Sequence, residues 1–179
     1  MSDGSESSVQ SCVRAIEQGF AGTSAPPRSW LWAWPEPQGE SLAQVQLFTA
    51  YERWESIPTD VLNAASGALF FARPIAFRFL CPAYLRAMVR SQLHVADPAR
   101  SLSLGFRGTP QDFDLLGRPF GAVTWRDYAT FRNAHFCLPE LEAICVCLDW
   151  VTRTAELSDD ELNVALREYW HPRLAALSR

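Results

Sequence analysis

Lysine is absent from this chain of 179 residues. All 16 basic residues are arginine, and 20 aspartates and glutamates bring the formal net charge to -4. Because arginine codons are rich in G and C, the absence of lysine is typical of a GC-rich genome. A chain with an acidic balance also lacks the basic surplus with which nucleic-acid-binding proteins neutralise phosphates. The composition therefore argues against nucleic acid as a partner.

Long apolar runs and a secretory leader are also missing. The apolar run 69–72 ends at Arg73 and Pro74, far short of the ~18 residues that a membrane helix requires. Residues 1–8 contain neither a basic residue nor an apolar segment, so they do not resemble a signal peptide. The cysteines are odd in number and lack the spacing of a disulfide framework: Cys12, Cys81, Cys137, Cys145 and Cys147. The sequence predicts a cytoplasmic protein with reduced thiols.

Familiar catalytic motifs are not found. The sequence has no nucleophile elbow, no P-loop and no dinucleotide-binding glycine pattern. Cys145 and Cys147 would lie about 200° apart around a helix, so they cannot share a metal ion. We therefore expect core thiols, no catalytic residue, no metal, no cofactor and no enzyme. The alternative is a cysteine nucleophile that meets one of the three histidines in space, namely His94, His135 or His171.

Hairpin turn signals are missing too, whereas apolar residues at helical spacing are abundant. We expect helices over 8–20, 41–54, 60–72, 75–95, 124–134 and 139–154, and a last one that a capping box opens at residue 158. Pro82 should kink or divide the fourth of these. Residues 97–121 should be irregular and residues 1–7 disordered. The predicted fold is an all-α, single-domain bundle of seven to eight helices over residues 1–179.

Residues 22–40 carry four prolines, which forbid a regular helix and predict an extended arm. Trp30, Trp32 and Trp34 alternate in this arm, so an extended chain projects their indoles to one side. One interpretation is that the arm straps the bundle and its indoles fill gaps. The other is a ridge that docks a partner, because tryptophan is enriched at binding hot spots.

Charge is unevenly distributed along the chain. Residues 73–107 hold six arginines and one acid, whereas residues 140–168 hold eight acids and two arginines. The two groups could pair with each other, or the acids could form a docking face for a basic partner. The candidate partner-binding acids are Glu156, Asp159, Asp160 and Glu161. The candidate residues for a small anion or ligand are Arg78, Tyr84, Arg86 and Arg90.

Three segments carry a family resemblance. They are Trp-x-x-Ile-Pro at 54–58, Ala-Phe-Arg-Phe-Leu-x-Pro-Ala-Tyr-Leu at 76–85 and Ala-Leu-x-x-Tyr-Trp at 165–170. Together they resemble a family of small bacterial proteins known only as a domain of unknown function. The resemblance implies a helical fold in a bacterium and supplies no activity.

These observations favour a cytoplasmic bacterial protein that binds another protein. The expected function is that of an immunity protein, which neutralises a basic toxin or effector by direct binding. The alternative is a small-ligand-binding protein or an enzyme with a pocket near the helix 75–95. That alternative predicts a cavity where Arg78, Tyr84 and a histidine or cysteine converge.

Overall fold

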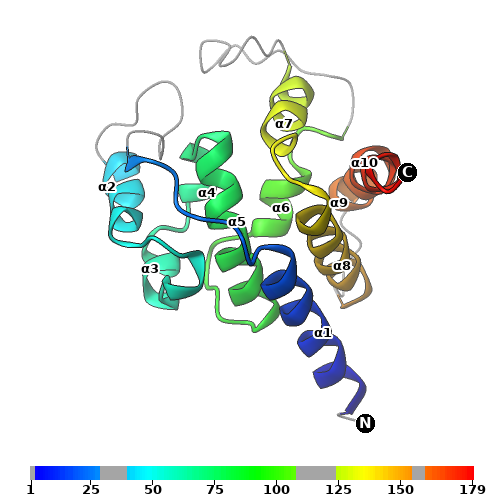
Figure 1. Ribbon diagram of the computed structural model, residues 1–179, viewed down its shortest axis with the longest axis horizontal. Helices are drawn as coiled ribbons and strands as arrows, with labels where there is room; N and C mark the ends of the chain where they lie inside the picture. The colour runs from blue at the N-terminus through cyan, green and yellow to red at the C-terminus, as the bar shows by residue number, and fades with distance from the viewer. Residues whose placement is uncertain (1–2, 29–39, 108–123, 155–159) are drawn as a thin grey trace.

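The computed structural model describes residues 3–28, 40–107, 124–154 and 160–179, and these residues confirm the predicted all-α class (Figure 1). The described ranges contain no β-strand, and an isolated antiparallel bridge joins Ser24 to Arg53. The α-helices are α1 (Asp3–Gly19), α2 (Glu40–Gln46), α3 (Thr59–Ala64), α4 (Ala68–Phe71), α5 (Pro74–Val89), α6 (Pro98–Ser103), α7 (Trp125–Asn133), α8 (Leu138–Thr154), α9 (Asp160–Ala165) and α10 (His171–Leu177).

Helix α5 is the centre of the fold, with α2, α3 and α4 on one side and α1 and α8 on the other (Figure 1). It is apolar around most of its circumference, as expected for a helix that is covered on several faces. Pro82 lies inside α5, yet the helix is continuous from residue 74 to residue 89, so the expected division at Pro82 is wrong. Neighbours such as Phe79 and Tyr84 are fully buried, and this packing outweighs the hydrogen bond that a proline cannot donate.

Helix α1 packs mainly against α8 and α5, and it begins at Asp3 rather than at residue 8. Its buried side carries Cys12, Val13 and Ile16, and Phe20, which follows the helix directly, is buried as well. At Gly19, the last residue of α1, the backbone of α1 approaches α8 closely. A Cβ atom at this position would lie 2.5 Å from the backbone oxygen of Pro139. Glycine is therefore required for this close approach of α1 to α8.

The predicted helix 41–54 is interrupted. It is observed as α2, a 3-10 turn η2 (Leu47–Ala50), a short extended stretch and a second 3-10 turn η3 (Trp54–Ser56). The extended stretch exists because the N–H of Ala25 donates to the backbone oxygen of Glu52 (3.1 Å). This contact also places the described beginning of the expected arm, residues 23–28, across the bundle. The rest of the arm, 29–39, lies outside the described residues.

The predicted helix 60–72 is divided into α3 and α4. The hydroxyl of Tyr84 donates to the carbonyl of Ala65 at the break (2.5 Å). The N–H of Gly67 donates to the side-chain oxygen of Gln44 (3.0 Å). This bond, too, is not one of the backbone hydrogen bonds within a helix. Side chains from α5 and α2 therefore take over backbone groups that a continuous helix would pair internally.

The region 97–121 was expected to be irregular, but it contains α6. The carboxylate of Asp97 accepts a hydrogen bond from the N–H of Arg100 (2.9 Å), and Pro98 occupies the first helical position. Both features are standard signals for the start of a helix. The pair Asp97-Pro98 could have been recognised in the sequence.

The C-terminal segment is helical from Asp160 onward, with a π-helical turn η6 (Leu166–Trp170) between α9 and α10. Trp170 is fully buried, and its indole N–H donates to the carbonyl of Leu102 (3.3 Å). The ring of Tyr169 stacks on that of Phe106 (4.7 Å between centroids). No helix in the described ranges is long and apolar enough to span a bilayer.

Candidate functional site

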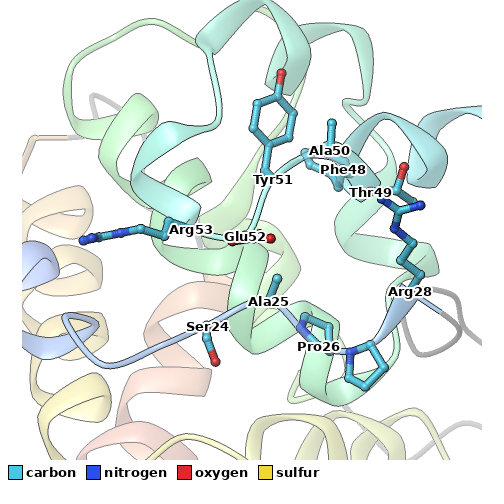
Figure 2. Close-up of a pocket in the computed structure, with 11 residues that line it drawn as sticks. Ser24, Ala25, Pro26, Arg28, Phe48, Thr49, Ala50, Tyr51, Glu52 and Arg53 are labelled. Atoms are coloured by element: carbon cyan, nitrogen blue, oxygen red, sulfur yellow. The ribbon is translucent and has the colours of Figure 1, made fainter.

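One hollow in the described surface lies between two segments, residues 24–28 and 48–53 (Figure 2). Its volume is about 580 Å³. The two segments run antiparallel, and the bridge between Ser24 and Arg53 holds them together at one end. The prolines at 26 and 27 have no N–H and fix their own φ angle, so they keep the first segment extended. The bridge between Ser24 and Arg53 and the two prolines therefore fix the path of the backbone on both sides of the hollow.

The hollow has an apolar base and a charged rim. Phe48 is buried beneath it, and Ala25 and Tyr51 are partly buried. Arg28 and Glu52 are exposed, and in Figure 2 Arg28 extends from the proline segment toward Thr49. Neither Arg28 nor Glu52 makes an ion pair within the described part of the chain, so charges of both signs are available to a ligand.

A second polar cluster lies where α5 meets the end of α1 and the start of α8. Its centre is the carboxylate of Glu140, which is 1% exposed. The Nε of Arg78 donates to both carboxylate oxygens (2.9 and 2.8 Å), and the hydroxyl of Thr23 donates to Oε1 (2.6 Å). The backbone N–H of Cys137 donates to Oε2 (3.0 Å). The buried charge is thus well compensated.

An exposed thiol borders this cluster. The Nη2 of Arg78 lies 3.9 Å from the Sγ of Cys137, which precedes the first residue of α8. His135 lies two residues earlier in the chain. Partial burial, followed by the charges of Arg78 and Arg173, lowers the pKa of His135 below its ordinary value. A thiol, a guanidinium and an imidazole therefore gather at one end of α8.

The other candidate ligand residues do not join Arg78. The hydroxyl of Tyr84 is buried against the α3–α4 break, as described above. Arg86 lies over the ring of Trp54 (4.9 Å to the centroid) and donates to the carbonyl of Glu55 (2.9 Å). Arg90 lies 3.9 Å from Glu17 at the surface. The structure brings Arg78 to a cysteine but does not assemble the arginines into one site.

Two of the candidate partner-binding acids, Asp160 and Glu161, lie at the start of α9 and contact the segment 105–107 of the same chain. Asp160 lies 3.7 Å from Arg107, and the carboxylate of Glu161 accepts a hydrogen bond from the N–H of Gly105 (3.3 Å). Glu156, Asp159 and the tryptophans at 30, 32 and 34 lie outside the described residues.

In the described parts of the chain, two ion pairs join the arginine-rich segment 73–107 to the acid-rich segment 140–168. They are Arg78 with Glu140 and Arg107 with Asp160. These two pairs support the interpretation that the arginine-rich and acid-rich segments pair with each other. Glu142, which is exposed, has no ion pair within the described ranges. The acidic segment is partly neutralised and keeps some outward-facing charge.

The structure adds polar groups that the sequence did not single out as a site. Arg132 in α7 is 2% exposed, and its donors reach the carbonyl of Ser101 and the side-chain oxygen of Asn133. Asn133 is fully buried, and its Nδ2 has no hydrogen-bond partner among the residues that the structure describes. No sequence signal marks Arg132, because its position looks like one of many surface arginines. Glu140 could have been found, since Cys-x-x-Glu before an apolar run resembles a capping box.

The prediction of core thiols is confirmed for the two cysteines within α8 and is wrong for Cys137, which is exposed just before the helix begins. Cys145 and Cys147 are both buried, and burial raises the pKa of Cys145 to about 12. Within the described part of the chain, no group of three or more histidine, cysteine or acidic side chains is arranged to hold a metal ion. No protein-family model, no curated protein and no solved structure matches this chain.

Proposed function

We propose that this chain is a cytoplasmic bacterial protein that neutralises a toxin or effector by binding it directly. The hollow between residues 24–28 and 48–53 is the observation that carries the proposal. It joins an apolar base to exposed charges of both signs, a combination that suits a protein side chain with an apolar stem and a charged end. It also lies at the start of the tryptophan-containing segment.

A basic partner is favoured because the whole chain has a net charge of -4. Complementary charge accelerates encounter and discriminates between partners. Glu52 at the rim of the hollow would receive an arginine or lysine of the toxin, while Arg28 would face an acid or a backbone carbonyl. In this proposal the bundle is a rigid support and has no catalytic role.

The experiment is co-expression with the toxin encoded by a neighbouring gene, combined with calorimetric binding to the purified toxin. Relief of toxicity and tight binding by the natural chain are expected. Glu52→Arg should weaken the binding at least tenfold, whereas Glu142→Arg, an equal change of charge on the exposed side of α8, should leave it unchanged. Equal affinities of the two variants would contradict the proposed docking site, and persistent toxicity would contradict the function.

The contact between Arg78 and Cys137 favours a second candidate, a thiol-dependent enzyme. The thiol of Cys137 is exposed and lies 3.9 Å from the guanidinium of Arg78, so it is accessible to a substrate, and cysteine is one of the side chains that act as nucleophiles. Turnover of simple ester or thioester substrates that is lost in Cys137→Ser would support this candidate. If the natural chain and the serine variant are equally inactive, Cys137 has no such role.

A further inference from the structure

A second hollow opens between α4 and the segment that leads into α6. Its volume is about 450 Å³, and its lining residues come from two stretches of the chain, 66–70 and 95–104. None of them belongs to the proposed toxin-binding hollow, which is lined by residues of the stretches 24–28 and 48–53. Small-molecule sites in proteins typically measure about 300–1,000 Å³, so the second hollow has the size of a site for a small ligand.

The walls of the second hollow carry large apolar side chains that are open to water. Phe70 in α4 is 44% exposed, and Val95, between α5 and α6, is 78% exposed. Leu104, which directly follows α6, lines the hollow as well and is partly buried. Because apolar surface gains free energy when it leaves water, these side chains favour a ligand with an apolar group of its own.

Two side chains of opposite charge also line the second hollow, namely Asp97 and Arg100. Asp97 directly precedes α6, and Oδ1 of its carboxylate accepts a hydrogen bond from the backbone N–H of Arg100 (2.9 Å). This bond fixes the carboxylate beside the first turn of the helix. Both side chains are exposed, and none of the ion pairs in the described ranges includes either of them. One negative and one positive group are therefore available to the same ligand.

Hydrogen bonds hold the segment that carries Val95 and Asp97 in place. The side-chain amide of Asn63 in α3 donates to the carbonyl of Gln92 (3.0 Å) and accepts from the backbone N–H of His94 (3.0 Å). These bonds join the segment to α3, and the chain continues from α3 into the stretch that forms the other side of the hollow. The two sides are thus linked before a ligand arrives, and a site that is already ordered loses less entropy on binding.

We propose that the second hollow binds a free apolar amino acid with a side chain of the size of leucine or phenylalanine. The guanidinium of Arg100 donates to the α-carboxylate of the ligand, and the second carboxylate oxygen of Asp97 accepts from its α-ammonium group. The apolar side chain of the ligand lies against Phe70, Val95 and Leu104. The site is separate from the toxin-binding hollow and does not depend on the toxin proposal.

Other small ligands match the second hollow less well. An apolar acid without an amino group would pair with Arg100 but would place its negative charge near Asp97 as well. An apolar amine would pair with Asp97 and leave the guanidinium of Arg100 without a partner. An amino acid carries both charges and the apolar group on one carbon atom, so it satisfies all three features at once.

The test is isothermal titration calorimetry of the full chain with L-leucine and L-phenylalanine as probes. The matched compounds are isocaproate, which is leucine without its amino group, isoamylamine, which is leucine without its carboxylate, and L-alanine, which lacks the large side chain. We expect saturable binding of at least one probe. Each matched compound should bind at least about tenfold more weakly, since it lacks one charged or apolar contact. The proposal is overturned if neither probe binds, or if isocaproate or isoamylamine binds as tightly as leucine.

Variants locate the ligand within the protein. Asp97→Asn removes the carboxylate but keeps a residue that caps helices well, and Arg100→Gln removes the guanidinium from an exposed position. Each should weaken the binding of the probe about tenfold. Arg14→Gln, the same change at an exposed position of α1, is the control and should bind the probe like the natural chain.

Asp97→Asn gives a further readout that a merely structural role of Asp97 would not move. It should narrow the difference in affinity between leucine and isocaproate, because the amino group of leucine then loses its ionic partner. Unchanged binding of the probe in both Asp97→Asn and Arg100→Gln would place the ligand elsewhere and overturn the proposal. Neither variant alters the toxin-binding hollow, so these results are separate from those of the toxin experiment.

Discussion

The guanidinium carbon of Arg132 lies 4.1 Å from the centroid of the Phe77 ring, in the interior of the bundle. Within the described part of the chain no carboxylate pairs with this arginine. Its hydrogen bonds go to the carbonyl of Ser101 and the side-chain oxygen of Asn133. Burial lowers the pKa of Arg132, as expected for a cation removed from water. The aromatic ring and the neutral acceptors are what stabilise the charge.

This arrangement predicts that the shape of the Arg132 side chain matters more than its charge. Arg132→Ala should lower the free energy of unfolding by roughly 2–5 kcal/mol, because it opens a cavity beside Phe77 and leaves the Ser101 carbonyl unpaired. Arg132→Met keeps an apolar stem against Phe77 and removes a buried charge, so it should cost less than the alanine variant. Urea unfolding measures both changes. Equal losses would contradict this ranking.

The pair of Arg78 and Glu140 should be strongly coupled. Arg78→Met leaves the buried Glu140 carboxylate without its cation and should cost roughly 2–3 kcal/mol, somewhat below a fully buried pair because Arg78 is partly exposed. The double variant Arg78→Met with Glu140→Met should lose less than the sum of the single losses. Arg53→Met, which breaks the exposed pair with Glu55, is the control and should leave the urea midpoint unchanged. Additive losses at 78 and 140 would show that the two residues act independently.

Gly19 and Gly22, both near the end of α1, allow the same substitution to be compared at a crowded position and at an open one. Gly19→Ala should lower the free energy of unfolding by roughly 1–3 kcal/mol, since the new methyl group would lie 2.5 Å from the Pro139 oxygen and 2.8 Å from the Cβ of Ala143. Gly22→Ala meets no atom within 4 Å and should be neutral. Thermal melts of the two variants test the close approach of α1 to α8, and a Gly19→Ala protein as stable as Gly22→Ala would argue against it.

His135 should make stability depend on pH in the weakly acidic range. Its pKa is lowered in the folded state by burial and by Arg78 and Arg173, so the unfolded chain takes up a proton first as the pH falls. The contribution of His135 is therefore fully present above the unfolded pKa of about 6.5, and it is lost as the pH falls from there through the folded pKa.

NMR titration of the His135 ring protons measures this shift directly. Arg78→Met should raise the pKa of His135 toward its ordinary value, because it removes one of the two nearby positive charges. His135→Gln should reduce the slope of stability against pH in the same range. An unchanged pKa of His135 in Arg78→Met would show that the two side chains do not interact.

The parts of the fold that depend on local signals were predictable from the sequence. Helix α7 begins at the capping box of Thr124 with Asp127, and α8 ends at residue 154, as the pattern indicates. The breaks in 41–54 and 60–72 were not predictable, because they depend on hydrogen bonds from distant segments. Ala25 reaches Glu52, and Tyr84 reaches Ala65.

The same distinction applies to the candidate sites. The alternative function required a cavity where Arg78, Tyr84 and a histidine or cysteine converge. Arg78 contacts Cys137, but the hydroxyl of Tyr84 donates to the carbonyl of Ala65 at the α3–α4 break, so these side chains do not converge. The hollow at 24–28 depends on the pairing of two segments that no local signal connects. The resemblance segments at 54–58, 76–85 and 165–170 contain many core residues, so they describe packing more than a site.

The pairing of α1 with α8 has a consequence for synthesis on the ribosome. More than one hundred residues separate the end of α1 from the start of α8. At a synthesis rate of about 5–20 residues per second, α1 waits at least several seconds for its main neighbour. During that interval the buried side of α1, which carries Ile16, lacks the cover that α8 gives it in the finished fold. The nascent chain thus presents the α8-facing apolar side of α1 to chaperones until α8 emerges.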